Sequence, residues 1–199
     1  MRWGKRYFPF FFLVVIIFAC HSRESKVEST PVMERVKPSA DSGINKKELA
    51  ERPSSDSINT GERSPEELVS YSKTLLGIPY LFASTDPAKG FDCSGFITYV
   101  FNHFDIKVPR SSIEFTNRGK DVDVEEAGPG DLILFTGTDS SMRKVGHMGL
   151  VESRRNDTLF FIHSSSGKAN GVVITPFEKY YQSRFVKIIR VFPEKYFSQ

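Results

Sequence analysis

The order of two hydrophobic periodicities is the strongest constraint on how this chain can fold. Between residues 64 and 119, apolar residues recur every three or four positions, as on one face of a helix. After the turn at 127–130, they come instead in short runs separated by turn residues. Five such runs are expected to be strands: 131–136, 146–152, 158–163, 172–174 and 185–192. Helices followed by a series of short strands favour an α+β domain with an antiparallel sheet.

The helical part has recognisable start signals. Ser64-Pro65, with Glu67 three residues after the serine, predicts a helix that continues past Leu68 to Gly77. Asp92 can cap a second helix, whose apolar face is headed by Cys93 and continues with Phe96, Ile97, Val100, Phe101 and Phe104. Two further helices are expected, one over 111–118 and one starting at 175–178.

The first nineteen residues have the pattern of an export signal. A basic start precedes a ten-residue apolar run, 10–19, which is too short to cross a hydrocarbon core of about 30 Å. The run ends at Ala19-Cys20, which resembles a bacterial lipobox and implies lipid attachment to Cys20. The residue after Cys20 is His21 rather than the Asp typical of inner-membrane retention. In a cell with two membranes, this pattern resembles that of lipoproteins sorted to the periplasmic face of the outer membrane. An ordinary signal peptide is the alternative.

The next segment, 20–63, is expected to be a disordered tether. It contains no Phe, Tyr or Trp, so it can bury too little apolar area to offset the entropy of ordering. The domain is therefore expected at 64–199. The net charge of +3 comes wholly from the basic residues of the signal, and the remaining chain is formally neutral. A neutral chain gives no electrostatic reason to expect a nucleic-acid partner.

Cys93 is the candidate nucleophile. The chain has two cysteines, and if Cys20 carries lipid, Cys93 has no intrachain partner. The start of a helix favours a thiolate, because unpaired N–H groups and the helix dipole meet there. Ser94 and Gly95 are small enough to leave room for a substrate. A buried, inert cysteine is the alternative.

A cysteine nucleophile needs a base that a third polar group orients. His21 lies in the tether, and His103 lies about 15 Å along the helix axis from Cys93. His147 and His163 remain, each on an expected strand, and neighbouring antiparallel strands could turn both to one side. Half-buried strand histidines bonded to backbone are the alternative. A zinc site is disfavoured, because these residues lack closely spaced ligand pairs.

Five short motifs then occur in order: Phe91-Asp92-Cys93-Ser94-Gly95-Phe96, Pro109-Arg110-Ser111-Ser112, Pro129 to Phe135 (PGDLILF), Gly146 to Val151 (GHMGLV), and Phe161-Ile162-His163-Ser164-Ser165. Together they resemble the NlpC/P60 family of cell-wall peptidases, over about two thirds of the chain. The resemblance implies a compact papain-like α+β domain that acts without a metal or organic cofactor.

The resemblance also implies a role for individual residues. Cys93 matches the nucleophile, His147 the general base, and His163 the residue that orients it. Tyr80 matches a tyrosine that helps hold the substrate or the oxyanion. Asp92 and Ser94 match positions that can bind a free amino end. The implied substrate is a peptidoglycan stem peptide or muropeptide, cut between D-glutamate and the diamino acid.

Two positions depart from the family pattern near the expected cleft. Ala83-Ser84 stands where Gly-Gly is frequent, and Phe115 stands where a Gln often occurs. Two other functions remain open. An amidase or acyltransferase could use Phe82 and Phe160-Phe161 to line an acyl pocket, and a lipoprotein could bind the wall without catalysis. A monomer is the expected state.

Overall fold

The computed structural model describes residues 57–198. The expected signal over 1–19 and the expected lipid attachment at Cys20 lie outside the described residues, as does the expected tether up to residue 56. Within residues 57–63, Ile58 is buried in the core at 8% exposure, so the packed domain already includes residues before Ser64. No helix in residues 57–198 is long and apolar enough to cross a membrane.

Two α-helices precede the main sheet, as the sequence predicts. Helix α2 (Pro65–Lys73) begins at Ser64 with the predicted capping box: Ser64 Oγ accepts from Glu67 N, and Glu67 accepts from Ser64 N. Helix α3 (Cys93–His103) is capped by Asp92, which accepts from Gly95 N. A two-stranded sheet of β1 (Thr85–Asp86) and β2 (Gly90–Phe91) leads into α3.

The main sheet has six strands in the order β3-β8-β4-β5-β6-β7, and every neighbouring pair is antiparallel. Its strands are β3 (Lys120–Val122), β4 (Leu132–Thr136), β5 (Val145–Arg155), β6 (Thr158–Ser165), β7 (Gly171–Pro176) and β8 (Phe185–Arg190). Helix α4 (Lys179–Arg184) connects β7 to β8. Short 3-10 helices lie at Ser112–Phe115, Val124–Glu126 and Glu194–Tyr196. The α+β fold with an antiparallel sheet is therefore confirmed.

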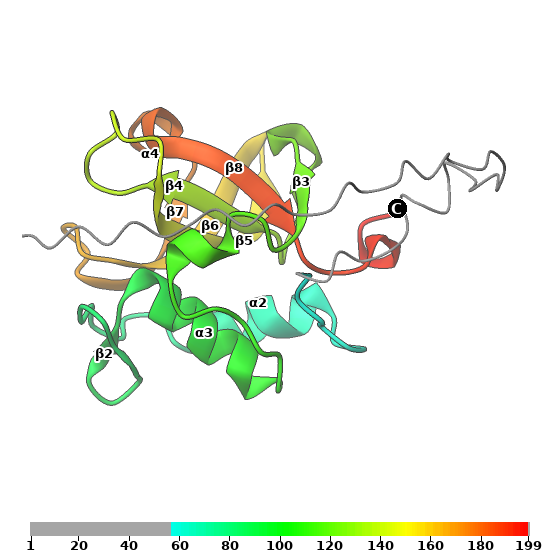
Figure 1. Cartoon of the computed structure of the whole chain (residues 1–199), viewed down its shortest axis with the longest axis horizontal. Helices are drawn as coiled ribbons and strands as arrows, with labels where there is room; N and C mark the ends of the chain where they lie inside the picture. Colours follow the sequence, from blue (N-terminus) through cyan, green and yellow to red (C-terminus); the bar gives the residue numbers. More distant parts are fainter. Residues whose placement is uncertain (1–56, 199) are drawn as a thin grey trace, which may run out of the picture. The chain divides into compact units, whose positions relative to one another are not determined.

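Each face of the sheet has its own core. The alternation of side chains along β4 separates Leu132 and Leu134 from Ile133 and Phe135. The first pair joins the core under α2 and α3, together with the buried face of α3: Phe96, Ile97, Val100 and Phe101. The second pair joins the other core, which includes residues around α4. Figure 1 shows α2 and α3 on one side of the sheet and α4 on the other.

The helix boundaries differ from the sequence prediction at three places, and several strand ends differ by one to three residues. Helix α2 ends at Lys73 rather than near Gly77, because the chain turns at 74–77 before β-bridge pairing begins. The segment expected as a helix over 111–118 forms only a 3-10 helix. The helix expected to start at Thr175 starts at Lys179, because β7 extends to Pro176 by pairing with β6. Thr175 is therefore a strand residue.

Candidate active site

Cys93 is the first residue of α3 and is partly exposed. It is free of any disulfide. Asp92, its neighbour, accepts at Oδ1 from Gly95 N (2.6 Å) and at its backbone carbonyl from Phe96 N (3.0 Å). The cap therefore satisfies the third and fourth N–H groups of the helix and leaves those of Cys93 and Ser94 directed at the sulfur.

The surroundings of the thiol have opposing effects on its pKa. Burial and the carboxylate of Asp92 raise the pKa of Cys93. Hydrogen bonding from the backbone N–H groups of Ser94, Met148 and Cys93 itself lowers it, but the net direction is upward. The helix start alone therefore does not make Cys93 a resting thiolate. The donated N–H groups can instead stabilise negative charge that appears during a reaction.

The chain before α3 passes very close to its first turn. A Cβ on Gly95 would lie 2.0 Å from the carbonyl oxygen of Ser84, so only glycine permits this approach. The same carbonyl accepts from Asp92 N (3.1 Å). Ala83 has a φ of +58°, a left-handed conformation that costs an alanine about 1 kcal/mol or more. The segment 81–84 is thus held against the first turn of α3, and Phe82 within it is 81% exposed.

The side chain of Asp92 is held by an arginine from a distant part of the chain. Arg110 donates to both carboxylate oxygens, from Nη1 to Oδ1 (3.0 Å) and from Nη2 to Oδ2 (2.6 Å). Its Nη1 also donates to Ser94 Oγ (2.9 Å), which in turn donates to Asp92 Oδ1 (3.2 Å). Sequence analysis quoted Arg110 within a motif but gave it no role.

Tyr80 lies close to both Cys93 and Asp92. Burial, with smaller contributions from the thiol of Cys93 and the carboxylate of Asp92, raises the pKa of its hydroxyl. The phenol is therefore neutral and available as a hydrogen-bond donor beside both groups. The three residues expected to bind substrate (Tyr80, Asp92 and Ser94) are thus gathered around Cys93.

The two candidate histidines contact each other directly. His147 on β5 and His163 on β6 are joined through Nε2 and Nδ1 at 2.8 Å. His147 is partly buried, and His163 is fully buried. Both rings lie against aromatic residues of the core on the α4 side, Phe135 and Phe161. The expectation that the histidines face one side of neighbouring antiparallel strands agrees with this geometry.

The thiol of Cys93 lies next to the strand that carries His147. Helix α3 packs against the face that carries Met148, Leu150 and Ile162. The N–H of Met148, the residue that follows His147, bonds the sulfur of Cys93. Pairing between β5 and β6 begins only at Leu150 and Ile162, so the strands are not paired at Met148. Cys93 therefore lies at hydrogen-bonding distance from the residue next to His147, at the end of β5 that β6 does not pair.

Both histidines are neutral at ordinary pH. Burial, followed by the nearby cation of Arg184, lowers the pKa of His147 to about 3. Burial, the neighbouring His147 and Arg184 lower the pKa of His163 well below its usual value. Arg184 is buried and is fixed by donation to the carbonyls of Thr136 (2.9 Å) and Gly137 (3.1 Å). Sequence analysis did not find Arg184, because an arginine at the end of a short helix gives no signal of burial.

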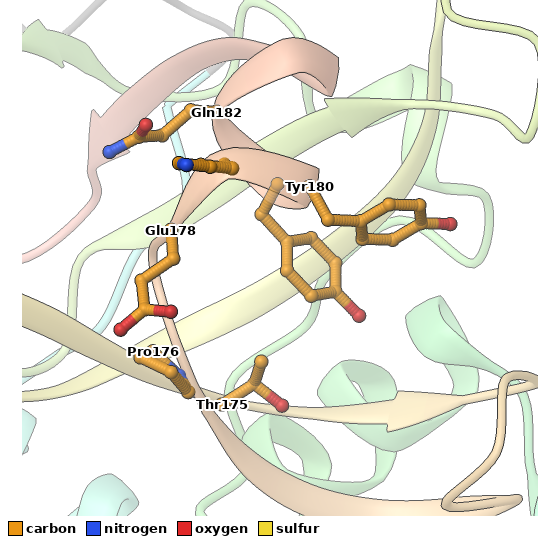
Figure 2. A pocket seen from close by; sticks show the side chains of 7 residues that line it. Thr175, Pro176, Glu178, Tyr180 and Gln182 are labelled. Carbon is orange, nitrogen blue, oxygen red and sulfur yellow. The ribbon is translucent and has the colours of Figure 1, made fainter.

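The second ring nitrogen of His163 has contacts of its own. Its Nε2 lies 3.0 Å from Thr175 Oγ1 and 3.5 Å from the hydroxyl of Tyr181. Thr175 and Tyr181 also line a pocket of about 430 Å³ whose other walls are Pro176, Glu178, Lys179, Tyr180 and Gln182. Figure 2 shows Thr175 on its strand below the helix that carries Tyr180 and Gln182. Cys93 and His147 do not line this pocket, so it adjoins the pair through the Nε2 side of His163.

The remaining sequence candidates lie apart. His103 is exposed near the end of α3 and stacks on Tyr71, with ring centroids 3.7 Å apart. Phe115 is fully buried in the core beneath α3, which explains why an apolar residue occupies that position. Phe161 is likewise fully buried, so it does not line an open acyl pocket. Within residues 57–198, no three His, Cys, Asp or Glu side chains are grouped to hold a metal ion.

Comparison with known proteins gives a consistent result. Residues 77–190 match the model of the NlpC/P60 family. The chain is 34% identical over 141 residues to a Gamma-DL-glutamyl hydrolase of Bacillus subtilis, covering 67% of this chain and 32% of that protein. It is 30% identical over 139 residues to a probable endopeptidase, NlpC, of Escherichia coli, covering 69% and 82%. The chain thus spans about a third of the Bacillus relative but most of the Escherichia one.

A solved structure supports the fold assignment. An NlpC/P60 family protein from Bacillus cereus superposes with a TM-score of 0.58 at 29% sequence identity. The match covers 68% of this chain and 42% of that one. The shared region is therefore a domain that occurs both in larger proteins and nearly alone.

Proposed function

The chain belongs to the NlpC/P60 family of cell-wall peptidases, and on that premise we propose that it is a cysteine endopeptidase that cuts peptidoglycan stem peptides. The observation that carries the proposal is the convergence of three groups from distant parts of the chain. The thiol of Cys93 lies free at a helix start, the N–H of the residue that follows His147 bonds its sulfur, and His163 bonds His147; these are the groups that nucleophilic catalysis needs.

The proposed reaction starts from neutral groups. As the sulfur of Cys93 attacks the amide carbonyl, His147 takes the thiol proton, because burial disfavours a resting ion pair. A C–S bond forms, and the carbonyl oxygen becomes an oxyanion. Backbone N–H groups at the start of α3 can donate to this oxygen.

Collapse of the intermediate completes the cycle. The C–N bond breaks, and His147 gives its proton to the leaving amine, which produces a thioester on Cys93. Water then attacks the thioester, with His147 taking its proton, and the thiol is released with a new carboxyl group. His163 orients His147 in every step through the Nε2–Nδ1 hydrogen bond.

We further propose that Asp92, Ser94 and Tyr80 receive a free amino end of the substrate. Asp92 supplies a buried carboxylate within reach of the nucleophile, and Arg110 fixes its orientation. The Bacillus subtilis relative is named for hydrolysis at glutamyl residues. That name supports a bond at D-glutamate as the site of cleavage here, and the diamino acid on its other side is what the family resemblance implies.

Digestion of purified muropeptides tests the activity. The full chain in mild detergent is incubated with muropeptides of defined stem length, and products are identified by mass spectrometry. Cys93→Ala is the matched control. Cleavage between D-glutamate and the diamino acid by the parent alone supports the proposal. Equal products from both proteins, or none from a folded parent, would reject it.

Attachment to a membrane through Cys20 is a separate proposal. It rests on the apolar run and the Ala19-Cys20 pair, which lie outside the described residues. Metabolic labelling with a radioactive fatty acid should mark the parent chain but not Cys20→Ala. Fractionation of a two-membrane host should then place the labelled chain with the outer membrane. Label on the variant would exclude Cys20 as the attachment point.

A further inference from the structure

The two nitrogens of His163 face different partners. Nδ1 meets His147 Nε2 at 2.8 Å, and Nε2 meets Thr175 Oγ1 at 3.0 Å. The ring is fully buried, so water does not replace either partner. The hydroxyl of Tyr181, at 3.5 Å from Nε2, is at the outer limit of hydrogen bonding. Thr175 therefore provides the better contact at this nitrogen.

The chemistry of His147 dictates where the protons must be. A neutral imidazole has one N–H and one nitrogen with a free lone pair. Since Nε2 of His147 is engaged with His163, only Nδ1 can accept a proton from a nucleophile. The single proton of neutral His147 must then be on Nε2, where it donates to His163 Nδ1.

His163 is subject to the same constraint. If Nδ1 of His163 accepts, the proton of neutral His163 must be on Nε2, and it needs an acceptor. The hydroxyl oxygen of Thr175 is that acceptor. In the opposite tautomer, His163 donates from Nδ1 to His147, which moves the proton of His147 to Nδ1 and leaves it unable to act as a base.

We propose that Thr175 is a positioning residue: its hydroxyl supplies the acceptor that the productive tautomer of His163 needs, and through His163 it keeps Nδ1 of His147 free to accept a proton. The assignment rests on the proposed function of His147. Thr175 touches neither the thiol nor a reacting atom, so its effect is indirect. A buried N–H without an acceptor is costly, and that cost opposes the productive tautomer when the hydroxyl is absent.

The variants separate a tautomer effect from a packing effect. Thr175→Val keeps the shape of the side chain but removes the acceptor, and Thr175→Ser keeps the hydroxyl. Thr158→Val, at the far end of β6, makes the same chemical change away from His163. All are made in the full chain, and folding is checked by thermal unfolding.

The first readout needs no substrate. Nitrogen NMR of 15N-histidine-labelled protein reports which ring nitrogen carries the proton, with signals assigned by single His→Gln variants. We expect protonated Nε2 on both His147 and His163 in the parent, in Thr175→Ser and in Thr158→Val. In Thr175→Val, we expect the protonated fraction at Nδ1 to rise. Unchanged tautomers in a folded Thr175→Val, or Nδ1–H in the parent, would overturn the proposal.

The second readout is muropeptide hydrolysis. Loss of the acceptor should lower kcat about 10–100-fold and leave KM unchanged. This is the loss typical when a residue that orients a metal-binding histidine is removed. Thr175→Ser should restore most of kcat. An equal loss for both Thr175 variants would mean that packing, not the hydroxyl, matters. If no variant or parent cleaves muropeptides, the proposed function fails, but the NMR result still decides the role of Thr175.

Discussion

Arg110 donates two hydrogen bonds to Asp92, the residue that caps the helix of Cys93. The carboxylate is nearly buried, with 11% of its side chain exposed, while the arginine side chain is 41% exposed. A single ion pair thus joins the loop after α3 to the start of α3. Because this pair lies beside Cys93, the stability of the fold and the geometry of the candidate active site depend on the same contact.

Arg110→Met should lower the free energy of unfolding by about 1.5–3 kcal/mol, because it leaves a largely buried carboxylate without its charged donor. Lys89→Met is the control. It breaks a pair with Asp86 that is exposed on both sides and should cost clearly less than the Arg110 change. Urea unfolding of both variants measures the difference, and equal costs would show that burial of Asp92 is unimportant.

Gly149 allows the histidine pair to form. A Cβ there would lie 2.6 Å from Phe161 Cδ2 and 3.2 Å from His163 Cβ. Gly149→Ala should therefore destabilise the fold by about 1–3 kcal/mol and lower kcat by displacing His163. Gly137→Ala is a matched control, since its Cβ meets nothing within 4 Å. Full activity of Gly149→Ala would argue against a tightly positioned His163.

Ala83 occupies a left-handed conformation with φ of +58°. Ala83→Gly should raise the free energy of unfolding by about 0.5–1 kcal/mol, because relief of strain exceeds the entropy that glycine adds to the unfolded chain. Ala88 is exposed and does not have a positive φ, so Ala88→Gly should instead lower the free energy of unfolding by about 0.4–1 kcal/mol. Thermal unfolding distinguishes the two directions. Destabilisation by both changes would refute the strain at Ala83.

The raised pKa of Cys93 predicts how the thiol responds to pH. Burial and the carboxylate of Asp92 disfavour the thiolate. The rate of alkylation by iodoacetamide should therefore keep increasing with pH above about 8.5, the ordinary pKa of a cysteine. Asp92→Asn, which removes the nearby charge, should shift the profile to lower pH. A plateau of reactivity between pH 4 and 6 would instead reveal a resting thiolate–imidazolium pair.

The lowered pKa values of the histidines predict an acid sensitivity of the fold. Between pH 6.5 and 5, a histidine is protonated in the unfolded chain, whereas His147, with a pKa of about 3, stays neutral in the folded one. The unfolded state binds more protons, so stability falls as pH is lowered through this window, by up to about 2 kcal/mol for each buried histidine.

His147→Gln should flatten that dependence. Carboxyl groups titrate mainly below pH 5, so the slope between pH 6.5 and 5 reports the two buried histidines. Urea unfolding at several pH values measures it, with His103→Gln as a control on an exposed residue. The prediction is wrong if parent and His147→Gln lose stability equally over this window.

The sequence alone determined the fold class, the start of both early helices, and the candidates Cys93, His147 and His163. These follow from local rules: capping residues at Ser64 and Asp92, the change of periodicity after 127–130, and the chemistry of a lone thiol. Local signals are read within a few residues, so one sequence is enough to reveal them.

Only the tertiary structure decided what surrounds these residues. Arg110 on Asp92, Arg184 near the histidines and Thr175 on His163 are contacts between segments separated by many residues. Thr175 illustrates the limit, since Thr-Pro-Phe-Glu predicts a helix start, yet pairing with β6 keeps it in a strand. Burial also raises the pKa of Cys93, reversing the effect of the helix start, because desolvation depends on neighbours that no local pattern specifies.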